Sequence, residues 1–486
     1  MVNSRTLSHY VSGAWIASKN EPLNADINPS DTTQELARIP QGSAEIVEQA
    51  VDAAQTAFAS WKAQTGSERA EVMYKAANAL AARRQEIGML AAQEVGKPLG
   101  EAVAEVDRGV AILRYFASEA VHPMGQVIPA QKAGSLQFSM RQPVGPVAII
   151  SPWNFPIAIP LWKMAPAIAY GNTVVWKPAE VASLTAVSIA ETFAEAGLPP
   201  GVVNLVLGKG STTGDALVNH EALKAISFTG SNDTGMGIAA VAARHNIKYQ
   251  LEMGGKNAVL VLDDANVVQA AKLTAAGAMR YAGQKCTATS RAIVTAGIVE
   301  RFIDQLKTEI AALPLLAATD PKSAIGPLIT QDSLEKVAFY AGIGAQSGHV
   351  VLGGRRASTD SLKNGYFFEP TVVTDVAPDA RIAQEEIFGP VLVMHTARSV
   401  EDALAIANST KYGLSVSLFT HDINAMLEYV QHIDCGMVRI NGDTTGVDPH
   451  APFGGMRASS SHSREQGPAA IEFFTETKTV QINAAE

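Results

Sequence analysis

Short apolar runs alternate with stretches of helical periodicity from residue 144 onward. The continuous apolar runs cover residues 146–151, 172–178, 202–208, 223–230 and 247–255. Between them apolar residues recur at helical spacing, which predicts helices at residues 160–170, 183–196, 211–219 and 234–244. Strands that are apolar on both faces and separated by helices are typical of βαβ units. We therefore expect a parallel sheet with helices on both of its faces.

A second series of the same kind follows the pair Gly254-Gly255. It starts with the apolar run 258–262 and continues past Phe419, with helices predicted at residues 266–280, 299–312 and 332–346. Before the first series, residues 44–120 carry the spacing of three amphipathic helices. The pattern predicts two α/β domains with a boundary near Gly254-Gly255.

Two further segments alternate between apolar and polar residues, which indicates half-exposed antiparallel strands. They are residues 134–142 and residues 471–482. Exposed strand edges commonly pair with another chain. We expect these two segments to form an element through which subunits associate.

Length and charge narrow the class of protein. A chain of 486 residues suggests two or three domains at roughly 100–200 residues each. The net charge of −9 argues against nucleic acid as a partner, because phosphate contacts need clustered Lys and Arg. The charged fraction of 17% lies below the usual value of roughly 25%, so we expect a large share of core or subunit interface.

The two cysteines, Cys286 and Cys435, are too few for a disulfide framework or a Cys-rich metal site. The ten histidines do not cluster and no zinc-binding signature occurs, so we predict no metal site. The first residues lack the apolar run of a secretory signal, and no apolar stretch reaches about 18 residues. We expect a soluble, cytoplasmic protein that does not bind membranes.

Cys286 is the first candidate for chemistry. It lies in the glycine-containing segment 282–287, directly after a predicted helix. A nucleophilic thiolate needs access and nearby backbone N–H groups, which such a loop can provide. The alternative is an inert buried cysteine, the commoner fate of a lone cysteine and the interpretation that we give Cys435.

Glu252 and Asn154 each lie at the end of a predicted strand. Open α/β folds bind their ligands at the carboxyl edge of the parallel sheet. Glu252, just before Gly254-Gly255, could act as a base there, or it could be a surface residue at a turn. Asn154, in the segment PWNFP, could donate to an oxyanion or could only organise the turn.

Two further strand ends suit a dinucleotide. Lys177 could contact ribose hydroxyl or phosphate groups, and Glu180 could accept from ribose hydroxyls while repelling a 2′-phosphate. Both residues could equally belong to a solvated turn. Gly230 and Ser231 close the next strand, and Gly235 is expected to begin a helix whose N-terminus suits phosphates. Short glycine patterns of this kind are weak support by themselves.

Taken in chain order, these segments resemble the NAD(P)-dependent aldehyde dehydrogenase superfamily. The segments are PWNFP (152–156), KPAE (177–180), FTGS (228–231), LEMGGKNA (251–258), GQKCTATSR (283–291), EEIFGPV (385–391) and PFGG (452–455). The likeness runs from the helices near residue 44 to the final strands. It implies an α/β fold with a Rossmann-like cofactor domain, a catalytic α/β domain and a β-strand oligomerisation arm.

The resemblance also implies where these parts lie. The NAD-binding domain would comprise residues 1–122 and 144–254, and the catalytic domain residues 255–458. Residues 123–143 and 470–486 would form the arm of a homodimer or homotetramer.

The resemblance implies roles for individual residues. Cys286 would attack the aldehyde, Asn154 and the Cys286 backbone N–H would form the oxyanion hole, and Glu252 would activate the hydrolytic water. Lys163 would lie near the nicotinamide side of the site. The implied cofactor contacts are Trp153, Lys177, Glu180, Gly230, Ser231, Gly235, Glu386 and Phe388. In this family a Glu at position 180 generally favours NAD, although NADP stays possible.

The substrate is less closely defined. Arg280 stands six residues before Cys286, where succinate-semialdehyde dehydrogenases carry a carboxylate-binding Arg, but it could also be a solvated or interface residue. A second Arg of that subgroup is Trp162 here, and Trp162, Phe155 and Phe453 would form an apolar wall. Several segments look closer to bacterial 2-oxoglutarate-semialdehyde dehydrogenases. We expect an acid semialdehyde as the substrate, with an aromatic or a broad range of aldehydes as the alternative.

Two other functions compete with this interpretation. A CoA-acylating enzyme of the same superfamily would use CoA in place of water, but such members commonly lack the equivalent of Glu252. A non-catalytic protein on the same fold would have no need of Cys286, Glu252 and Asn154 together.

Overall fold

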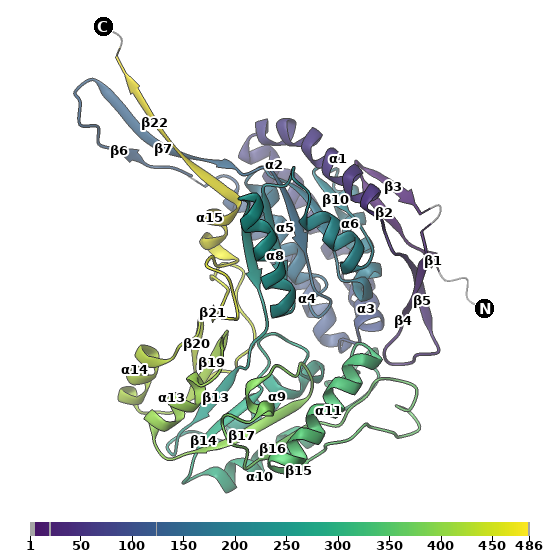
Figure 1. Ribbon diagram of the computed structural model, residues 1–486, viewed down its shortest axis with the longest axis vertical. Coiled ribbons are helices and arrows are strands. Elements are labelled where there is room, and N and C mark those ends of the chain that lie inside the picture. Colours follow the sequence, from purple (N-terminus) through teal and green to yellow (C-terminus); the bar gives the residue numbers. More distant parts are fainter. Residues whose placement is uncertain (1–4, 19–20, 123, 485–486) are drawn as a thin grey trace.

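The computed structural model describes residues 5–18, 21–122 and 124–484. Two seven-stranded sheets, each covered by helices, form the upper and lower halves of the molecule, and a long strand arm projects from the upper half (Figure 1). The chain has the α/β class that the alternating pattern predicts.

The upper sheet has the strand order β12-β11-β8-β9-β10-β2-β3. Its five parallel strands are β8 (Pro146–Ile150), β9 (Thr173–Lys177), β10 (Val203–Leu205), β11 (Ala225–Thr229) and β12 (Lys248–Glu252). The hairpin of β2 (Ser8–Val11) and β3 (Ala14–Ala17) adds an antiparallel edge. The helices that follow the parallel strands are α5 (Ala158–Ala169), α6 (Ser183–Glu195), α7 (Asp215–Val218) and α8 (Asn232–His245).

Both faces of the upper sheet are buried, which explains the continuous apolar runs. Val174 and Trp176 of β9 pack in one hydrophobic cluster with α4, α5 and α6. Val175, between them, points to the opposite face and packs with α1 and α8. A strand buried on both sides needs apolar side chains at every position, so the alternation of a half-exposed strand is lost.

The N-terminal part holds four helices where the periodicity predicts three. They are α1 (Ala44–Ala63), α2 (Gly66–Ala82), α3 (Arg84–Val95) and α4 (Leu99–Glu119). The Thr65 and Glu68 side chains form a capping box that starts α2. The prediction of three helices is wrong because a single non-helical residue, Arg83, separates α2 from α3 without any Gly or Pro in the sequence to mark the break. A small sheet of β1 (Arg5–Thr6), β4 (Leu23–Ile27) and β5 (Glu35–Pro40) precedes them.

The lower sheet has the order β15-β16-β17-β14-β13-β19-β20, and all its pairs are parallel except β15 with β16. Its strands are β13 (Ala258–Val261), β14 (Arg291–Thr295), β15 (His349–Leu352), β16 (Thr371–Thr374), β17 (Val391–Ala397), β19 (Ser415–Phe419) and β20 (Met437–Ile440). Its helices are α9 (Val267–Met279), α10 (Val299–Ala311), α11 (Gln331–Ser347), α12 (Arg381–Gln384), α13 (Val400–Asn408) and α14 (Ile423–His432). The short pair β18 (Tyr412–Gly413) and β21 (Met456–Arg457) lies beside it.

The arm consists of β22 (Thr475–Asn483), β7 (Ser135–Pro143) and the short β6 (Val127–Ile128), all antiparallel. One part of the prediction is wrong: residues 470–474 form a helix, α15 (Ala470–Phe474), and only residues from 475 onward enter the arm. Phe473 and Phe474 are buried in the upper core, so the apparent alternation there was a helix turn. The arm itself leaves apolar side chains exposed, at Val127, Leu136, Met140 and Ile482.

Among the described residues, no helix is long and apolar enough to cross a membrane. Within the same residues no three His, Cys, Asp or Glu side chains are grouped so that they could hold a metal ion.

Candidate active site

Cys286 lies between the two halves, on a loop that follows α9. Two consecutive residues, Tyr281 and Ala282, have left-handed backbone conformations at φ of 57° and 51° and turn the chain sharply there. The buried Gln284 fixes the loop, because its Nε2 donates to the Pro327 carbonyl at 3.0 Å and its Oε1 accepts from the Ile329 N–H at 3.0 Å. Neither of the two cysteines is in a disulfide.

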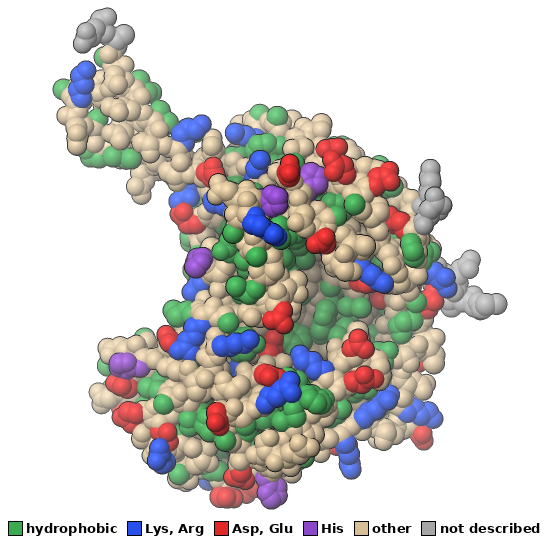
Figure 2. Space-filling view, in the orientation of Figure 1, with side chains coloured by type: hydrophobic (Ala, Val, Ile, Leu, Met, Phe, Trp, Pro, Cys, Tyr) green, Lys and Arg blue, Asp and Glu red, His purple; other side chains and the backbone are tan. Residues whose placement is uncertain are grey.

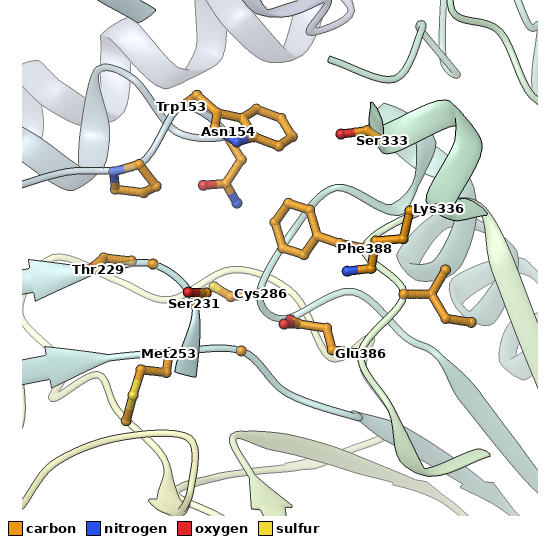
Figure 3. A pocket seen from close by; sticks show the side chains of 14 residues that line it. Trp153, Asn154, Thr229, Ser231, Met253, Cys286, Ser333, Lys336, Glu386 and Phe388 are labelled. Carbon is orange, nitrogen blue, oxygen red and sulfur yellow. The ribbon is translucent and has the colours of Figure 1, made fainter. Parts of the chain in front are cut away.

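Asn154 lies beside this loop, after the end of β8. Its Nδ2 donates to the Gln284 carbonyl at 3.1 Å, and the side chain is buried. The side-chain amide of Asn has two N–H donors, and the bond to Gln284 occupies one of them. Asn154 and Cys286 line the same pocket of about 240 Å³, where both are seen across from Phe388 and Glu386 (Figure 3). The arrangement leaves the second N–H available to an oxygen held near the Cys286 sulfur.

Aromatic and charged groups form the far wall of this pocket. Phe388 has a left-handed backbone at φ of 61°, and its ring stands edge-on to Trp153 with 5.6 Å between centroids. Backbone strain of this kind is frequent where a side chain must be aimed at a ligand. Glu386 accepts from the Gly255 N–H at 3.1 Å. Lys336, from α11, also lines the pocket and was not a sequence candidate, since one Lys on a helix carries no local signal (Figure 3).

The resting thiol is not poised to ionise. Burial raises the pKa of Cys286 to about 12, and the carboxylates of Glu386 and Glu252 add to the increase. At neutral pH the group is therefore a thiol, and it needs a base or a nearby positive charge before it can attack.

Glu252 is the last residue of β12 and lies just beneath this pocket without lining it. Its Oε2 accepts from the Ser460 hydroxyl at 2.6 Å, while Oε1 has no hydrogen-bond partner among the described residues. Burial, and then the neighbouring carboxylate of Glu465, raise the pKa of Glu252 well above its ordinary value. A buried carboxyl whose pKa is raised binds a proton more readily than an exposed one, which suits a group that takes part in general acid–base chemistry.

Lys163 does not line the pocket. It is fully buried, pairs with Glu465 and donates to the Ser227 hydroxyl at 3.0 Å. Glu465 also accepts from the Trp162 indole N–H at 2.7 Å. The sequence gives no sign of Glu465, because it stands in a polar tail about 300 positions from both partners.

A larger cavity of about 920 Å³ continues from the first pocket along the carboxyl edge of the upper sheet. The two share the lining residues Pro152, Trp153, Thr229, Gly230 and Ser231. Figure 2 shows the hollow between the two halves, with hydrophobic side chains in its wall. The Ser231 hydroxyl caps α8, so the positive end of a fourteen-residue helix faces the cavity. Its size and this anion-binding end suit a dinucleotide.

One detail of the predicted phosphate turn is wrong. α8 begins at Asn232, so Gly235 lies within the first helical turn and does not start the helix. Gly235 packs on Met253: a Cβ built there would lie 2.6 Å from the Met253 sulfur. Gly237, in contrast, lines the cavity and faces open space. Gly235 therefore sets the packing of the helix on the sheet.

Lys177 and Glu180 line the same cavity at its outer end. Burial lowers the pKa of Lys177 to about 8, and its Nζ donates to the Pro178 carbonyl at 2.7 Å. Glu180 accepts from the Asn24 amide, whose oxygen in turn accepts from Gln41. Asn24 lies in β4 and Gln41 directly follows β5; neither was a sequence candidate.

The three aromatic candidates and Cys286 share one hydrophobic cluster. Trp162 and Phe453 have ring centroids 5.3 Å apart, and Phe155 and Cys286 pack against the same cluster. Arg280, at the C-terminal end of α9, is exposed, with Glu101 as a charged neighbour, and it lines neither of these two cavities.

Comparison with known proteins identifies the class. The model of the aldehyde dehydrogenase family matches residues 15–480. Alpha-ketoglutaric semialdehyde dehydrogenase of Bacillus subtilis is 45% identical over 99% of each chain. Alpha-ketoglutarate semialdehyde dehydrogenase of Haloferax volcanii is 39% identical over 97% of this chain and 98% of its own.

Solved structures agree. Betaine aldehyde dehydrogenase of Staphylococcus aureus, in complex with NAD⁺, matches at a TM-score of 0.95 with 33% identity over 98% of this chain and 95% of its own. The half-buried Cys286 beside the Asn154 amide, in a pocket that joins a larger cavity, agrees with the class of NAD(P)-dependent aldehyde dehydrogenases. The chain belongs to the aldehyde dehydrogenase family.

Proposed function

We propose that this enzyme oxidises an acid semialdehyde, such as 2-oxoglutarate or succinate semialdehyde, to the carboxylate with NAD. The names of two relatives that match nearly the whole chain at 45% and 39% identity carry the choice of substrate. The pocket of Cys286 and the proposed dinucleotide cavity share lining residues, which supports hydride transfer from a substrate on Cys286 to NAD.

In the proposed reaction the Cys286 sulfur bonds to the aldehyde carbon, and the thiol proton passes to solvent water in the pocket. The aldehyde oxygen then carries negative charge, which the second Asn154 N–H and the Cys286 backbone N–H stabilise. NAD, when bound, supplies a hydride acceptor. Loss of hydride from the carbon leaves a thioester on Cys286.

Glu252 acts in the second half of the reaction. It turns from Ser460 toward the thioester and takes a proton from water as the water oxygen attacks the carbonyl carbon. The carbon–sulfur bond then breaks, the carboxylate leaves, and Cys286 takes back a proton. Burial and Glu465 raise the pKa of Glu252, which favours its protonated form. Glu252 can therefore keep the proton that it takes from water while the carbon–sulfur bond breaks.

Glu180 underlies the proposed preference for NAD. Its carboxylate lines the cavity and is held by Asn24, so a 2′-phosphate in that position meets fixed negative charge. The relative from Staphylococcus aureus has NAD⁺ bound, which agrees with this choice. NADP remains usable to the extent that Glu180 can move away.

The aromatic wall favours a second candidate function. Trp162 and Phe453 present an apolar surface next to Cys286 and would suit an aromatic aldehyde or a broad range of aldehydes. In the acid-semialdehyde proposal, Arg280 is the sequence candidate for the carboxylate contact.

We also propose roles for the two halves of the molecule and for the arm. We propose that the upper half binds NAD, that the lower half supplies the nucleophile, and that exposed apolar residues of the arm join subunits into a dimer or tetramer. A reducing, cytoplasmic setting would keep the Cys286 thiol free.

The test is the formation of NADH, followed by its absorbance, with 2-oxoglutarate semialdehyde, succinate semialdehyde, hexanal and benzaldehyde. We expect kcat/KM for the two acid semialdehydes to exceed the values for hexanal and benzaldehyde. Higher values for benzaldehyde would favour the second candidate. Absence of NADH with every aldehyde, from folded protein, would refute both.

A further inference from the structure

A third cavity, of about 530 Å³, lies between α4, the first part of β20 and the loop of residues 443–453. It shares no lining residue with the cofactor cavity. Two arginines line it, Arg108 from α4 and Arg439 from β20, together with Asp448 of the loop. None of the three residues was a sequence candidate.

Two contacts connect this cavity to the segment that carries Cys286. In the loop, the Thr444 hydroxyl donates to the carbonyl of Thr287, the residue after Cys286, at 2.7 Å. Val447, which lines the cavity, packs against the same hydrophobic cluster as Cys286 and Trp162. Pro452, which also lines the cavity, directly precedes Phe453 of the aromatic wall, so the cavity lies next to that wall.

Hydrogen bonds also hold α4 to α5, the helix that carries Trp162. Glu105, one turn before Arg108, accepts from the Ile157 and Ala158 N–H groups at 2.8 Å each. These two residues start the helix α5 that carries Trp162. Arg108 is therefore mounted on a rigid element next to the substrate side and not on a free surface loop.

The Arg108 guanidinium has no hydrogen bond or ion pair within the described part of the chain. Its Nη2 is buried and without a partner. Burial lowers the pKa of Arg108, and its charged neighbours Asp448 and Glu105 only partly oppose this effect. An arginine stays charged in proteins, so a half-buried guanidinium without a partner favours a bound anion.

The other charges at the cavity leave it net positive. Arg439 donates to the Gly446 carbonyl, which ties it to the loop, and its Nε is buried without a partner. Asp448 is exposed, so water weakens its effect on Arg108. With two arginines and one aspartate, the wall attracts a single negative charge.

We propose that Arg108 binds the carboxylate of the substrate, with Arg439 adding positive charge to the same subsite. This inference rests on the proposed function and names its specificity determinant. A planar guanidinium can bind a carboxylate through two parallel hydrogen bonds, which fixes both the charge and the orientation of the chain. With the carboxylate at Arg108, the carbon chain of the semialdehyde lies along Trp162 and Phe453 and its aldehyde end faces Cys286.

The experiment measures kcat/KM for 2-oxoglutarate semialdehyde and for hexanal in the full-length enzyme. The variants are Arg108→Met, which keeps the length of the side chain without its charge, Arg280→Ala, and Arg114→Met as a matched control. Arg114 is on the same helix but is exposed, where it donates to Asn78. We expect Arg108→Met to lower kcat/KM for the semialdehyde about 10- to 100-fold and to leave hexanal within about 3-fold of the wild type. Arg114→Met should change neither value.

The outcomes separate this inference from the proposed function. If the wild type does not prefer the semialdehyde to hexanal, the proposed function fails. If the wild type prefers it and Arg108→Met keeps that preference, the Arg108 subsite is refuted, and a loss of preference in Arg280→Ala would place the contact there. If Arg108→Met does not fold, inhibition of hexanal oxidation by glutarate decides: Arg108→Lys should weaken this inhibition, and unchanged inhibition would refute the subsite.

Discussion

Asn154→Ala distinguishes an oxyanion donor from a residue that only organises its loop. In the structure one amide N–H of Asn154 donates to the Gln284 carbonyl at 3.1 Å, next to the nucleophile's own segment. Replacement by Ala removes that bond and also removes the second N–H, which we assign to the aldehyde oxygen.

The two effects have different sizes. Loss of one neutral hydrogen bond costs about 0.5–1.5 kcal/mol of stability. Loss of an oxyanion donor typically lowers kcat about 10²- to 10³-fold, or about 2.7–4 kcal/mol in the transition state. We therefore expect Asn154→Ala to unfold only slightly more easily while its kcat falls by at least about 100-fold.

The assay pairs kcat for a semialdehyde with the free energy of unfolding in urea. Asn204→Ala is the matched control, because Asn204 is a buried amide that donates to Val174 and Gly201 and accepts from Ser12, far from the pocket. It should cost at least as much stability and keep a near-normal kcat. If both variants lose stability and kcat to the same degree, Asn154 is a structural residue and the oxyanion assignment is wrong.

Three further predictions concern the base, the cofactor and the thiol. Glu252→Gln should give an initial burst of NADH close to the enzyme concentration and a steady state slower by about 10²- to 10⁴-fold; an unchanged steady state would remove Glu252 as the base. Asn24→Leu frees the Glu180 carboxylate and should raise the ratio of kcat/KM for NADP to that for NAD, as should Glu180→Ser; a constant ratio in both variants would dissociate Glu180 from selectivity. Because the Cys286 pKa is raised to about 12, alkylation of its peptide by iodoacetamide in the absence of NAD should accelerate about tenfold per pH unit through the alkaline range and be faster in Glu386→Gln; a plateau near neutral pH would contradict the raised pKa.

The sheets could be predicted because burial leaves a direct trace in the sequence. Every residue of β9 and β11 is buried, so these segments read as continuous apolar runs. Helix ends marked only by backbone angles leave no such trace, which is why the break at Arg83 was missed. In α15, apolar residues next to a strand give the sequence an alternating pattern like that of a strand. The structure instead buries Phe473 and Phe474 in the upper core as part of a helix.

The candidate site was partly predictable for a related reason. Asn154 and Glu252 lie at the ends of parallel strands, and the topology brings strand ends to one edge. The partners of these residues could not be found in the same way. Ser460 and Glu465 stand in a polar C-terminal segment, and they contact Glu252 and Lys163, which lie more than 200 positions earlier in the chain. Arg108 looks like any polar position on a helix until the loop of residues 443–453 closes over it.

The central claim is that Cys286 carries the substrate as a thioester, and it can be tested by trapping that species. Glu252→Gln enzyme is mixed with NAD and 2-oxoglutarate semialdehyde, quenched in acid after the burst, and digested for mass spectrometry of the Cys286 and Cys435 peptides. We predict an acyl group on the Cys286 peptide in an amount close to the NADH formed, and none on the buried Cys435 peptide. NADH formation without any adduct on Cys286, or undiminished activity in Cys286→Ala, would contradict the account.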